Sequence, residues 1–166
     1  SSAASDVYKR QEQDNFNGEG SYRLTQQEHL MLKNVTDVFD KTVVLLNTSN
    51  IIDMKWVDEY DIDSVLYIWQ GGQEGGEAVA DILCGDKCPS GRLTDTIANN
   101  YTDYPSSENF GSKEENLYRE DIYVGYRYFE TFAKDRVKYP FGFGLSYTDF
   151  KITCADFRIE NDIVKF

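Results

Sequence analysis

Four glycines that follow a short apolar run are the residues whose spacing first suggests chemistry in this chain. They are Gly71, Gly72, Gly75 and Gly76, and the apolar run before them covers residues 65–69. Glycine-rich turns after a strand can hold phosphate groups, but this spacing fits neither the dinucleotide-binding motif nor the P-loop, and no lysine directly follows. We therefore predict a tight strand-to-helix turn and disfavour a nucleotide-binding domain.

Trp69 and Glu74, on either side of the first glycines, have side chains that could also act on a ligand. The Trp69 ring could stack on a sugar, although packing against the core or a neighbouring domain is the favoured interpretation. Glu74 stands where a helix is expected to begin, and a carboxylate is stabilised there by the helix dipole. We therefore assign neither residue a catalytic role.

Cysteine and histidine supply few candidate metal ligands. The chain has three cysteines, Cys84, Cys88 and Cys154, and one histidine, His29. Because these residues lack the spacing of zinc sites, we expect no metal, and no motif indicates a cofactor. An odd number of cysteines is interpreted as reduced thiols, which favours a cytoplasmic, bacterial-type protein. His29 is expected at the surface or in packing.

Composition limits the class of protein and its partners. The chain has 166 residues, of which 40% are hydrophobic, so it is long enough for one domain with a sizeable core. The net charge of -12 argues against nucleic acid and anionic membranes as partners, because both require a basic surface. No apolar run approaches the roughly 18 residues of a membrane span.

The elements that must position any site follow from local patterns. Thr25 and Glu28 match a capping box, which predicts that a helix begins there. Residues 41–47 form a continuous apolar run, which suits a strand covered on both faces, as in parallel sheets. Residues 77–83 carry apolar side chains at helical spacing, and Gly85 is placed to end that helix. Strand, glycine turn and helix together predict an open α/β sheet.

Both ends of the chain differ in character from its centre. After Tyr147, apolar residues alternate with polar ones, and residues 160–162 are a plausible turn between two strands. We therefore expect the opening of an all-β domain there. Residues 1–11 show no helix or strand period, and their codons can spell a transposase adaptor that is used to tag sequencing libraries. We interpret residues 1–11 as translated adaptor rather than native protein.

Seven segments, in the same order and at plausible spacing, resemble the C-terminal α/β-sandwich domain of glycoside hydrolase family 3, the β-glucosidase and β-xylosidase family. They are TVVLLN (42–47), IDMKW (52–56), WQGGQEGG (69–76), AVADIL (78–83), PSGRL (89–93), DIYVGYRY (121–128) and YPFGFGLSYT (139–148). The resemblance implies a truncated, open α/β sandwich with a mostly parallel sheet over residues 12–146. It also implies that residues 147–166 begin a fibronectin-III-like β-sandwich.

This resemblance implies part of a retaining β-glycosidase, with a β-glucoside or other β-linked oligosaccharide as the substrate. Retention requires two carboxylates about 5–5.5 Å apart, one as the nucleophile and one as the acid/base. In the family, the nucleophile is an aspartate on an N-terminal (β/α)8 barrel, and no segment of these 166 residues resembles that barrel. The acid/base is a glutamate in a Gly-Glu loop shortly before the helix that we expect to begin at Thr25.

The loop of this chain departs from the family pattern at the acid/base position. Counting back from Asp14 without gaps places the acid/base at Gln11, which cannot protonate a leaving oxygen. One deletion places it at Glu12, and the other interpretation is that adaptor sequence has replaced the native glutamate. Glu19 is a weaker alternative, because it stands too near the helix. Without the nucleophile, the chain alone is expected to be inactive, and a non-catalytic sugar-binding or scaffolding module is the competing hypothesis.

Overall fold

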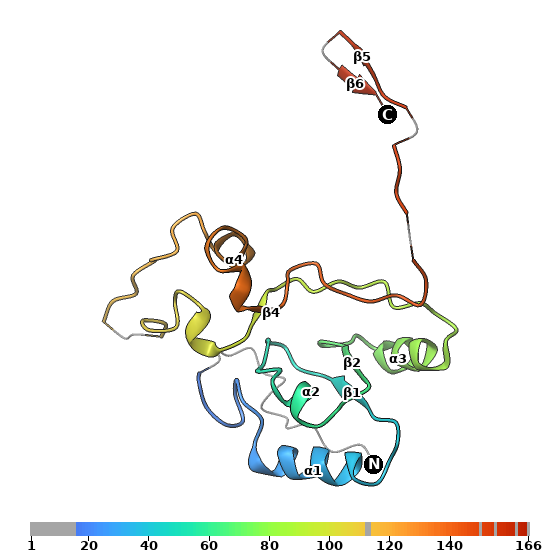
Figure 1. The fold of residues 1–166 in the computed structure, drawn as a ribbon, viewed down its shortest axis with the longest axis vertical. Coiled ribbons are helices and arrows are strands. Elements are labelled where there is room, and N and C mark those ends of the chain that lie inside the picture. Colours follow the sequence, from blue (N-terminus) through green and yellow to red (C-terminus); the bar gives the residue numbers. More distant parts are fainter. Residues whose placement is uncertain (1–15, 112–113, 150, 155, 162, 166) are drawn as a thin grey trace.

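The computed structural model describes residues 16–111, 114–149, 151–154, 156–161 and 163–165 (Figure 1). Its α-helices are α1 (Gln26–Thr36), α2 (Trp56–Glu59), α3 (Gly75–Cys84) and α4 (Tyr126–Phe132), and two short 3-10 helices are η2 (Tyr101–Asp103) and η3 (Lys134–Arg136). Its strands are β1 (Val43–Leu46), β2 (Ser64–Tyr67), β3 (Ile97–Ala98), β4 (Val137–Tyr139), β5 (Arg158–Glu160) and β6 (Ile163–Lys165).

The described strands form three separate two-stranded sheets. β1 and β2 pair in parallel, with Val44 opposite Val65 and Leu46 opposite Tyr67. The pairs β3–β4 and β5–β6 are antiparallel. The predicted parallel strands are therefore present, but the described residues hold a smaller parallel sheet than the sequence led us to expect.

Both predicted helix ends have the expected local chemistry. The Thr25 backbone N–H donates to the Glu28 carboxylate at 2.7 Å, and the Glu28 backbone N–H donates to the Thr25 hydroxyl at 3.3 Å. This reciprocal pair is the predicted capping box, and it begins α1. At the end of α3, Gly85 has a φ of 84°, in the left-handed region that a residue without Cβ adopts at little cost.

The main core covers one face of the β1–β2 pair. Val44, Leu46, Val65 and Tyr67 pack against a buried cluster composed of Leu24, Leu32, Ile52, Met54, Trp56 and Ile97. We call this the inner face. The opposite, outer face carries Val43 and Leu45, which are 51% and 40% exposed. The prediction that the apolar run 41–47 is covered on both faces is therefore wrong for the residues that the structure describes.

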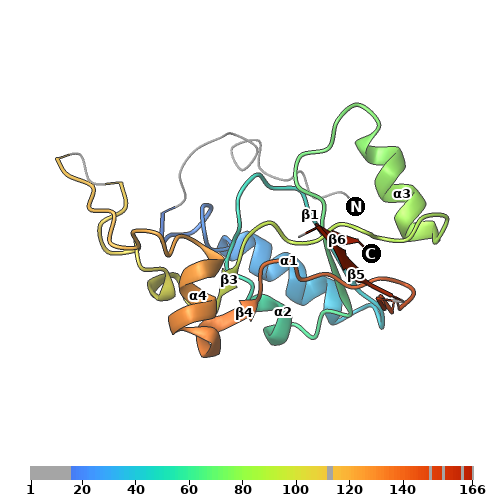
Figure 2. The same cartoon turned by 90° about the horizontal axis from the view of Figure 1, so that it is seen from above.

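Helix α3 lies on the other side of the strand pair from α2 in both ribbon views (Figure 1, Figure 2). Its apolar residues Val79 and Ile82 are half-buried, Leu83 is exposed, and none of its residues is fully buried. The helix therefore forms where the apolar spacing predicts it, yet it leaves Val43 and Leu45 open to solvent.

A second, smaller core is built around α4. Ala98, Phe129 and Ala133 are buried together, and Tyr104 packs its ring edge against Phe129 at 5.5 Å between ring centroids. Residues 121–129 show no helical pattern in the sequence, because Gly125 interrupts this aromatic segment. In the structure, Gly125 directly precedes α4 with a φ of 61°, so the glycine begins the helix instead of breaking it.

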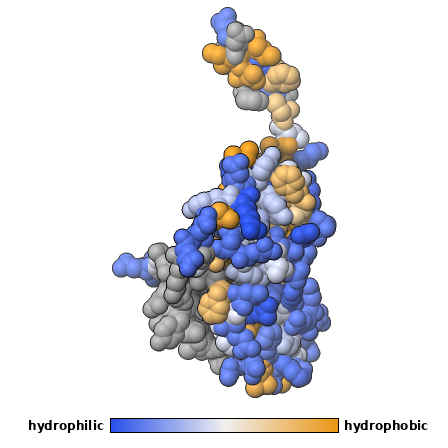
Figure 3. Space-filling model, turned by 90° about the vertical axis from the view of Figure 1, so that its left-hand side faces the viewer, coloured by the Kyte–Doolittle hydropathy of each residue, from blue (hydrophilic) through white to orange (hydrophobic). Residues whose placement is uncertain are grey.

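The C-terminal strands form a hairpin that stands apart from the rest of the described chain (Figure 1). β5 and β6 pair at the predicted turn, where Asn161 has a φ of 51°. The apolar side chains Ile159, Ile163 and Val164 are exposed, and the space-filling view shows hydrophobic surface on this hairpin (Figure 3). The predicted two-strand pattern is confirmed, but these strands bury none of their apolar residues in the described chain.

Candidate functional site

An open pocket of about 290 Å³ lies at the carboxyl ends of β1 and β2. Its lining includes the aromatic residues Tyr22, Trp69, Tyr101 and Tyr104 together with the polar residues Asn50 and Asp95. Residues 49–51 reach the pocket shortly after β1 ends, and Trp69 reaches it after β2. Ligands of open α/β sheets bind outside the carboxyl ends of the strands, so this pocket is the candidate site.

Trp69 is held in a strained backbone conformation at the edge of the pocket. Its φ is 51°, which is uncommon for an aromatic residue and costs on the order of 1–3 kcal/mol. The indole packs on Tyr67, with ring centroids 4.3 Å apart and an angle of 41° between the ring planes. Trp69 thus makes the predicted packing contact and also lines the pocket.

Tyr22 and Tyr104 form one wall of the pocket, and their hydroxyl groups differ in hydrogen bonding. The Tyr104 hydroxyl donates to the Thr96 carbonyl at 3.1 Å and accepts from the Ala98 backbone N–H at 2.9 Å. The Tyr22 side chain is 2% exposed, and its hydroxyl lies near that of Tyr104. Within the described part of the chain, the Tyr22 hydroxyl makes no hydrogen bond of normal geometry.

Burial keeps the tyrosines of this region protonated. Loss of solvent is the main cause that raises the pKa of Tyr22, Tyr67 and Tyr104 above the ordinary value, and nearby carboxylates act in the same direction. The Tyr67 hydroxyl donates to the Asn50 carbonyl, which fixes the loop after β1. At neutral pH, these three side chains are therefore uncharged hydrogen-bonding groups.

The acid/base candidates precede α1 in the sequence. Glu12 falls outside the described residues. Glu19 is exposed in a turn that the Gly20 backbone N–H closes on the Arg23 carbonyl at 2.9 Å, and it is not among the residues that line the pocket. The same loop reaches the pocket at Tyr22, whose backbone carbonyl accepts from the Asp53 N–H at 2.7 Å.

Other residues singled out in the sequence lie away from the pocket. The glycine turn leads into α3, and a Cβ on Gly71 would lie 3.0 Å from the Gly75 Cα, a tight contact that favours glycine there. Glu74 is exposed just before α3, and its side chain makes no capping hydrogen bond. His29 is half-buried and its Nδ1 lies 2.8 Å from the Tyr60 hydroxyl, which is a packing contact.

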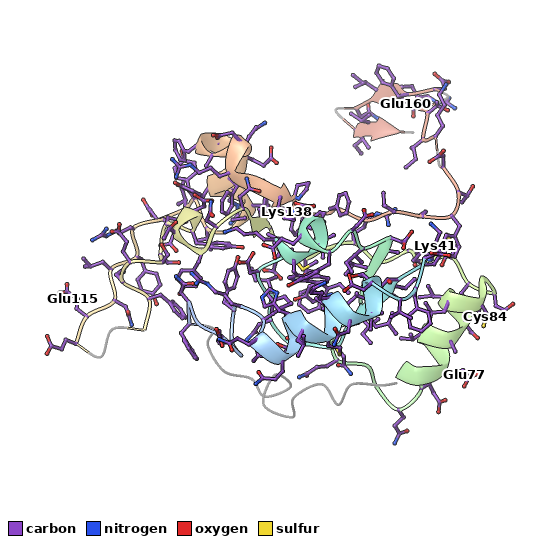
Figure 4. All side chains as sticks on the ribbon, turned by 60° about the horizontal axis from the view of Figure 1, so that its bottom comes forward. Lys41, Glu77, Cys84, Glu115, Lys138 and Glu160 are labelled. Atoms are coloured by element: carbon purple, nitrogen blue, oxygen red, sulfur yellow. The ribbon has the colours of Figure 1, made fainter. Side chains whose placement is uncertain are left out.

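The cysteines are dispersed over the surface. Cys84, Cys88 and Cys154 are exposed free thiols. Figure 4 shows Cys84 and Glu77 on α3, far from Lys138 on β4. Across the described ranges, no group of three histidine, cysteine, aspartate or glutamate side chains is placed to hold a metal ion. Nor is any helix in those ranges both long and apolar enough to cross a membrane.

Sequence reasoning missed most of the pocket. Trp69 was singled out, but Tyr22, Tyr101 and Tyr104 were not, because they lie far apart in the chain and follow no motif. The Tyr22 and Tyr101 rings meet edge to face, with centroids 5.2 Å apart. The only available signal was aromatic content: Tyr22 stands just before a capped helix, and Tyr101 and Tyr104 flank a pair of polar residues.

A family model and curated relatives of known sequence point to the same protein family. The family model described as the glycosyl hydrolase family 3 C-terminal domain matches residues 3–126. A β-glucosidase of Ruminococcus albus is 52% identical over 154 residues, which cover 93% of this chain and 16% of that protein. The β-glucosidase A of Butyrivibrio fibrisolvens is 48% identical over 145 residues, which cover 85% of this chain and 17% of that protein.

Solved structures give the same result for the fold. The crystal structure of a β-glucosidase from Paenibacillus barengoltzii matches with a TM-score of 0.85 and 54% identity, over 92% of this chain and 17% of that one. The β-glucosidase 3B of Thermotoga neapolitana matches with a TM-score of 0.78 and 37% identity, over 90% of this chain and 22% of that one. The chain therefore spans less than a quarter of each of these four proteins.

Proposed function

This chain belongs to glycoside hydrolase family 3, within its C-terminal domain, and from that membership we propose that it forms the acid/base part of a retaining β-glucosidase. The proposed substrate is a β-linked glucoside or oligosaccharide. The observation that carries the proposal is the position of the loop before α1, which reaches an aromatic and polar pocket at the carboxyl ends of the parallel strands. Tyr22 brings this loop to a cavity of the kind that binds small polar ligands.

In the proposed reaction, Glu12 protonates the leaving oxygen and later takes a proton from the attacking water. The nucleophile is an aspartate of a (β/α)8 barrel that is not part of this chain. Two alternatives remain for the acid: the native glutamate was replaced by adaptor sequence at position 11, or Glu19 acts from its exposed turn. The proposed domains are an adaptor over 1–11, an α/β sandwich over 12–146, and a fibronectin-III-like start over 147–166, which the β5–β6 hairpin supports.

A chimera tests the proposal as a whole. The 166-residue chain alone should not hydrolyse an aryl β-glucoside, because the nucleophile is missing. Residues 12–166 should restore hydrolysis when they replace the matching segment of the Ruminococcus albus β-glucosidase, whose sequence is 52% identical. Turnover by the isolated chain, or a folded but inactive chimera, would contradict the proposal.

Leaving-group dependence tests the role of Glu12 within that chimera. Glu12→Gln should slow hydrolysis of cellobiose by roughly 10²–10⁴-fold, because its leaving oxygen needs a proton. Cleavage of a dinitrophenyl β-glucoside should fall much less in the first step, since that leaving group departs without protonation. Glu19→Gln is the matched control and should leave both rates unchanged. If only Glu19→Gln shows the leaving-group pattern, the acid/base assignment moves to Glu19.

A non-catalytic sugar-binding module is the second candidate function, and the pocket itself favours it. The pocket could bind a sugar without any acid on the loop. Genomic sequence upstream of the Glu12 codon decides between the two functions. A barrel with its aspartate and a Gly-Glu loop supports the enzyme, whereas a gene without either supports the binding module. The same sequence tests whether residues 1–11 are native.

A further inference from the structure

Two of the three cysteines stand on either side of the point where α3 ends. Cys84 is the last residue of the helix, Cys88 follows after a three-residue turn, and both are exposed free thiols. Exposed thiols are open to oxidation, and two thiols that can meet react as a pair. The proposed function uses neither side chain, so any role of this pair lies outside it.

The turn between the two cysteines folds the chain back against the helix. The Asp86 and Lys87 N–H groups both donate to the Asp81 carbonyl, at 2.8 and 3.1 Å. The left-handed glycine after the helix makes this reversal possible. Cys88 is therefore brought back beside the last turn of α3, which carries Cys84. A disulfide needs Cα atoms within about 7 Å of each other, and the reversal shortens this separation relative to an extended chain.

The Cys88 sulfur also holds a second segment to the end of α3. The Tyr147 backbone N–H donates to the Cys88 Sγ at 3.2 Å, and the Tyr147 hydroxyl donates to the Ile82 carbonyl at 2.9 Å. Next to it, the Ser146 hydroxyl donates to the Pro89 carbonyl at 3.3 Å. Beyond Tyr147 the chain leads to the β5–β6 hairpin, which stands apart from the rest of the described chain (Figure 1). The Cys88 sulfur is thus part of the anchor from which the hairpin extends.

We propose that Cys84 and Cys88 form a reversible disulfide that loosens this anchor when the surrounding thiols become oxidised. One cysteine thiolate attacks a low-molecular-weight disulfide such as oxidised glutathione, which forms a mixed disulfide and releases one glutathione. The other cysteine attacks the protein sulfur of that mixed disulfide and releases the second glutathione. The two protein thiols are thereby oxidised, the glutathione disulfide is reduced, and the two protons pass to the departing glutathione thiols.

The new bond changes what the Cys88 sulfur does for Tyr147. To bond Cys84, the sulfur turns towards α3, and the Tyr147 N–H loses its acceptor. An exposed disulfide that closes a short loop is easily reduced again, because a short loop gains little stability from the cross-link. Reduction then restores the anchor, so the pair acts as a switch. This switch goes beyond the proposed function, because it requires neither Glu12 nor a barrel.

Thiol trapping and peptide mass test the disulfide. The 166-residue chain is equilibrated with reduced or oxidised glutathione, alkylated, and digested with trypsin, which cuts after Lys87, between the two cysteines. In oxidised glutathione, peptides 56–87 and 88–92 should remain linked, and dithiothreitol should separate them. Cys154 should stay outside the link. Unlinked peptides, a link to Cys154, or a link between two chains overturns the inference.

Hydrogen exchange at the Tyr147 amide tests the switch. Exchange should be about fivefold faster in the disulfide form than in the reduced chain, the effect of losing one hydrogen bond. Reduced Cys88→Ala should exchange as fast as the disulfide form, because it also lacks the sulfur acceptor. Reduced Cys84→Ala keeps that acceptor and is the matched control, which should exchange as slowly as the reduced chain. Equal exchange in the reduced and disulfide forms, or slow exchange in reduced Cys88→Ala, overturns the inference.

Discussion

The two faces of the β1–β2 pair are built from similar residues but have different surroundings. The inner face, with Val44 and Leu46, packs on the main core beneath α1 and α2. The outer face, with Val43 and Leu45, is about half exposed, although α3 lies on that side of the strands. Apolar sequence therefore determines that a strand forms, whereas the rest of the chain determines which face is buried.

The largest effect should come from the inner face. Leu32 on α1 is 6% exposed and belongs to the cluster against which Val44 and Leu46 pack. Leu32→Ala should lower the free energy of unfolding by about 2–5 kcal/mol, because it removes buried contacts and leaves a cavity. Urea denaturation measures the loss. A loss below about 1 kcal/mol would mean that α1 is not held on this face.

Alkaline pH should destabilise the folded chain through its buried tyrosines. The pKa values of Tyr22, Tyr67 and Tyr104 are raised in the folded state, so above pH of about 10 the unfolded chain loses protons that the folded chain keeps. The free energy of unfolding should then fall by about 1.4 kcal/mol per pH unit for each tyrosine.

Urea titrations between neutral pH and pH of about 11 measure this fall. In Tyr22→Phe, the free energy of unfolding should fall less steeply with pH above the ordinary tyrosine pKa. The difference in slope should equal the contribution of one tyrosine, about 1.4 kcal/mol per pH unit. Tyr118 is 88% exposed, so Tyr118→Phe is the control and should leave the slope unchanged. Equal slopes in the two variants would show that Tyr22 is not protected from ionisation.

A smaller effect should come from the start of α1, which carries Leu32 to the inner face. Thr25→Ala removes the capping box and should destabilise the chain by about 1 kcal/mol. Thr36→Ala is the matched control on the same helix, because the Thr36 hydroxyl only bonds back to helix carbonyls, those of Leu32 at 3.1 Å and Lys33 at 3.2 Å. Thermal melts compare the two variants, and equal losses would contradict a specific role of the cap.

The smallest effect should come from the outer face. Leu45→Ala makes the same chemical change as Leu32→Ala, but at a side chain that is 40% exposed. The isolated chain should lose less than about 1 kcal/mol. In the chimera with the Ruminococcus albus enzyme, the same substitution should cost more if that protein covers the outer face. Equal costs in both settings would show that the outer face stays open there too.

Local features of the fold could be predicted from the sequence. The capping box at Thr25, the left-handed stop at Gly85 and the turn before β6 each depend on a few neighbouring residues. The positions of β1 and β2 followed from apolar runs of strand length, and resemblance of seven ordered segments identified the family.

Long-range features could not be predicted in the same way. β3 has two residues and is defined only by its pairing with β4. Gly125 looked like an interruption because the sequence does not reveal that its φ of 61° lets α4 begin. Tyr22 and Tyr104 meet only in the folded chain, and the difference between their hydroxyls depends on where the Thr96 carbonyl lies. Whether Glu12 is the acid stays a prediction.

The wall of the pocket also has a consequence for synthesis on the ribosome. Tyr22 emerges before Tyr104, and Phe129, which supports the Tyr104 ring, follows later still. At about 5–20 residues per second, Tyr22 leaves the ribosome on the order of ten seconds before Phe129 does. During that interval Tyr22 lacks the Phe129-supported Tyr104 ring that it meets edge to face in the folded chain. The nascent chain thus exposes an aromatic side chain that is buried once the chain has folded.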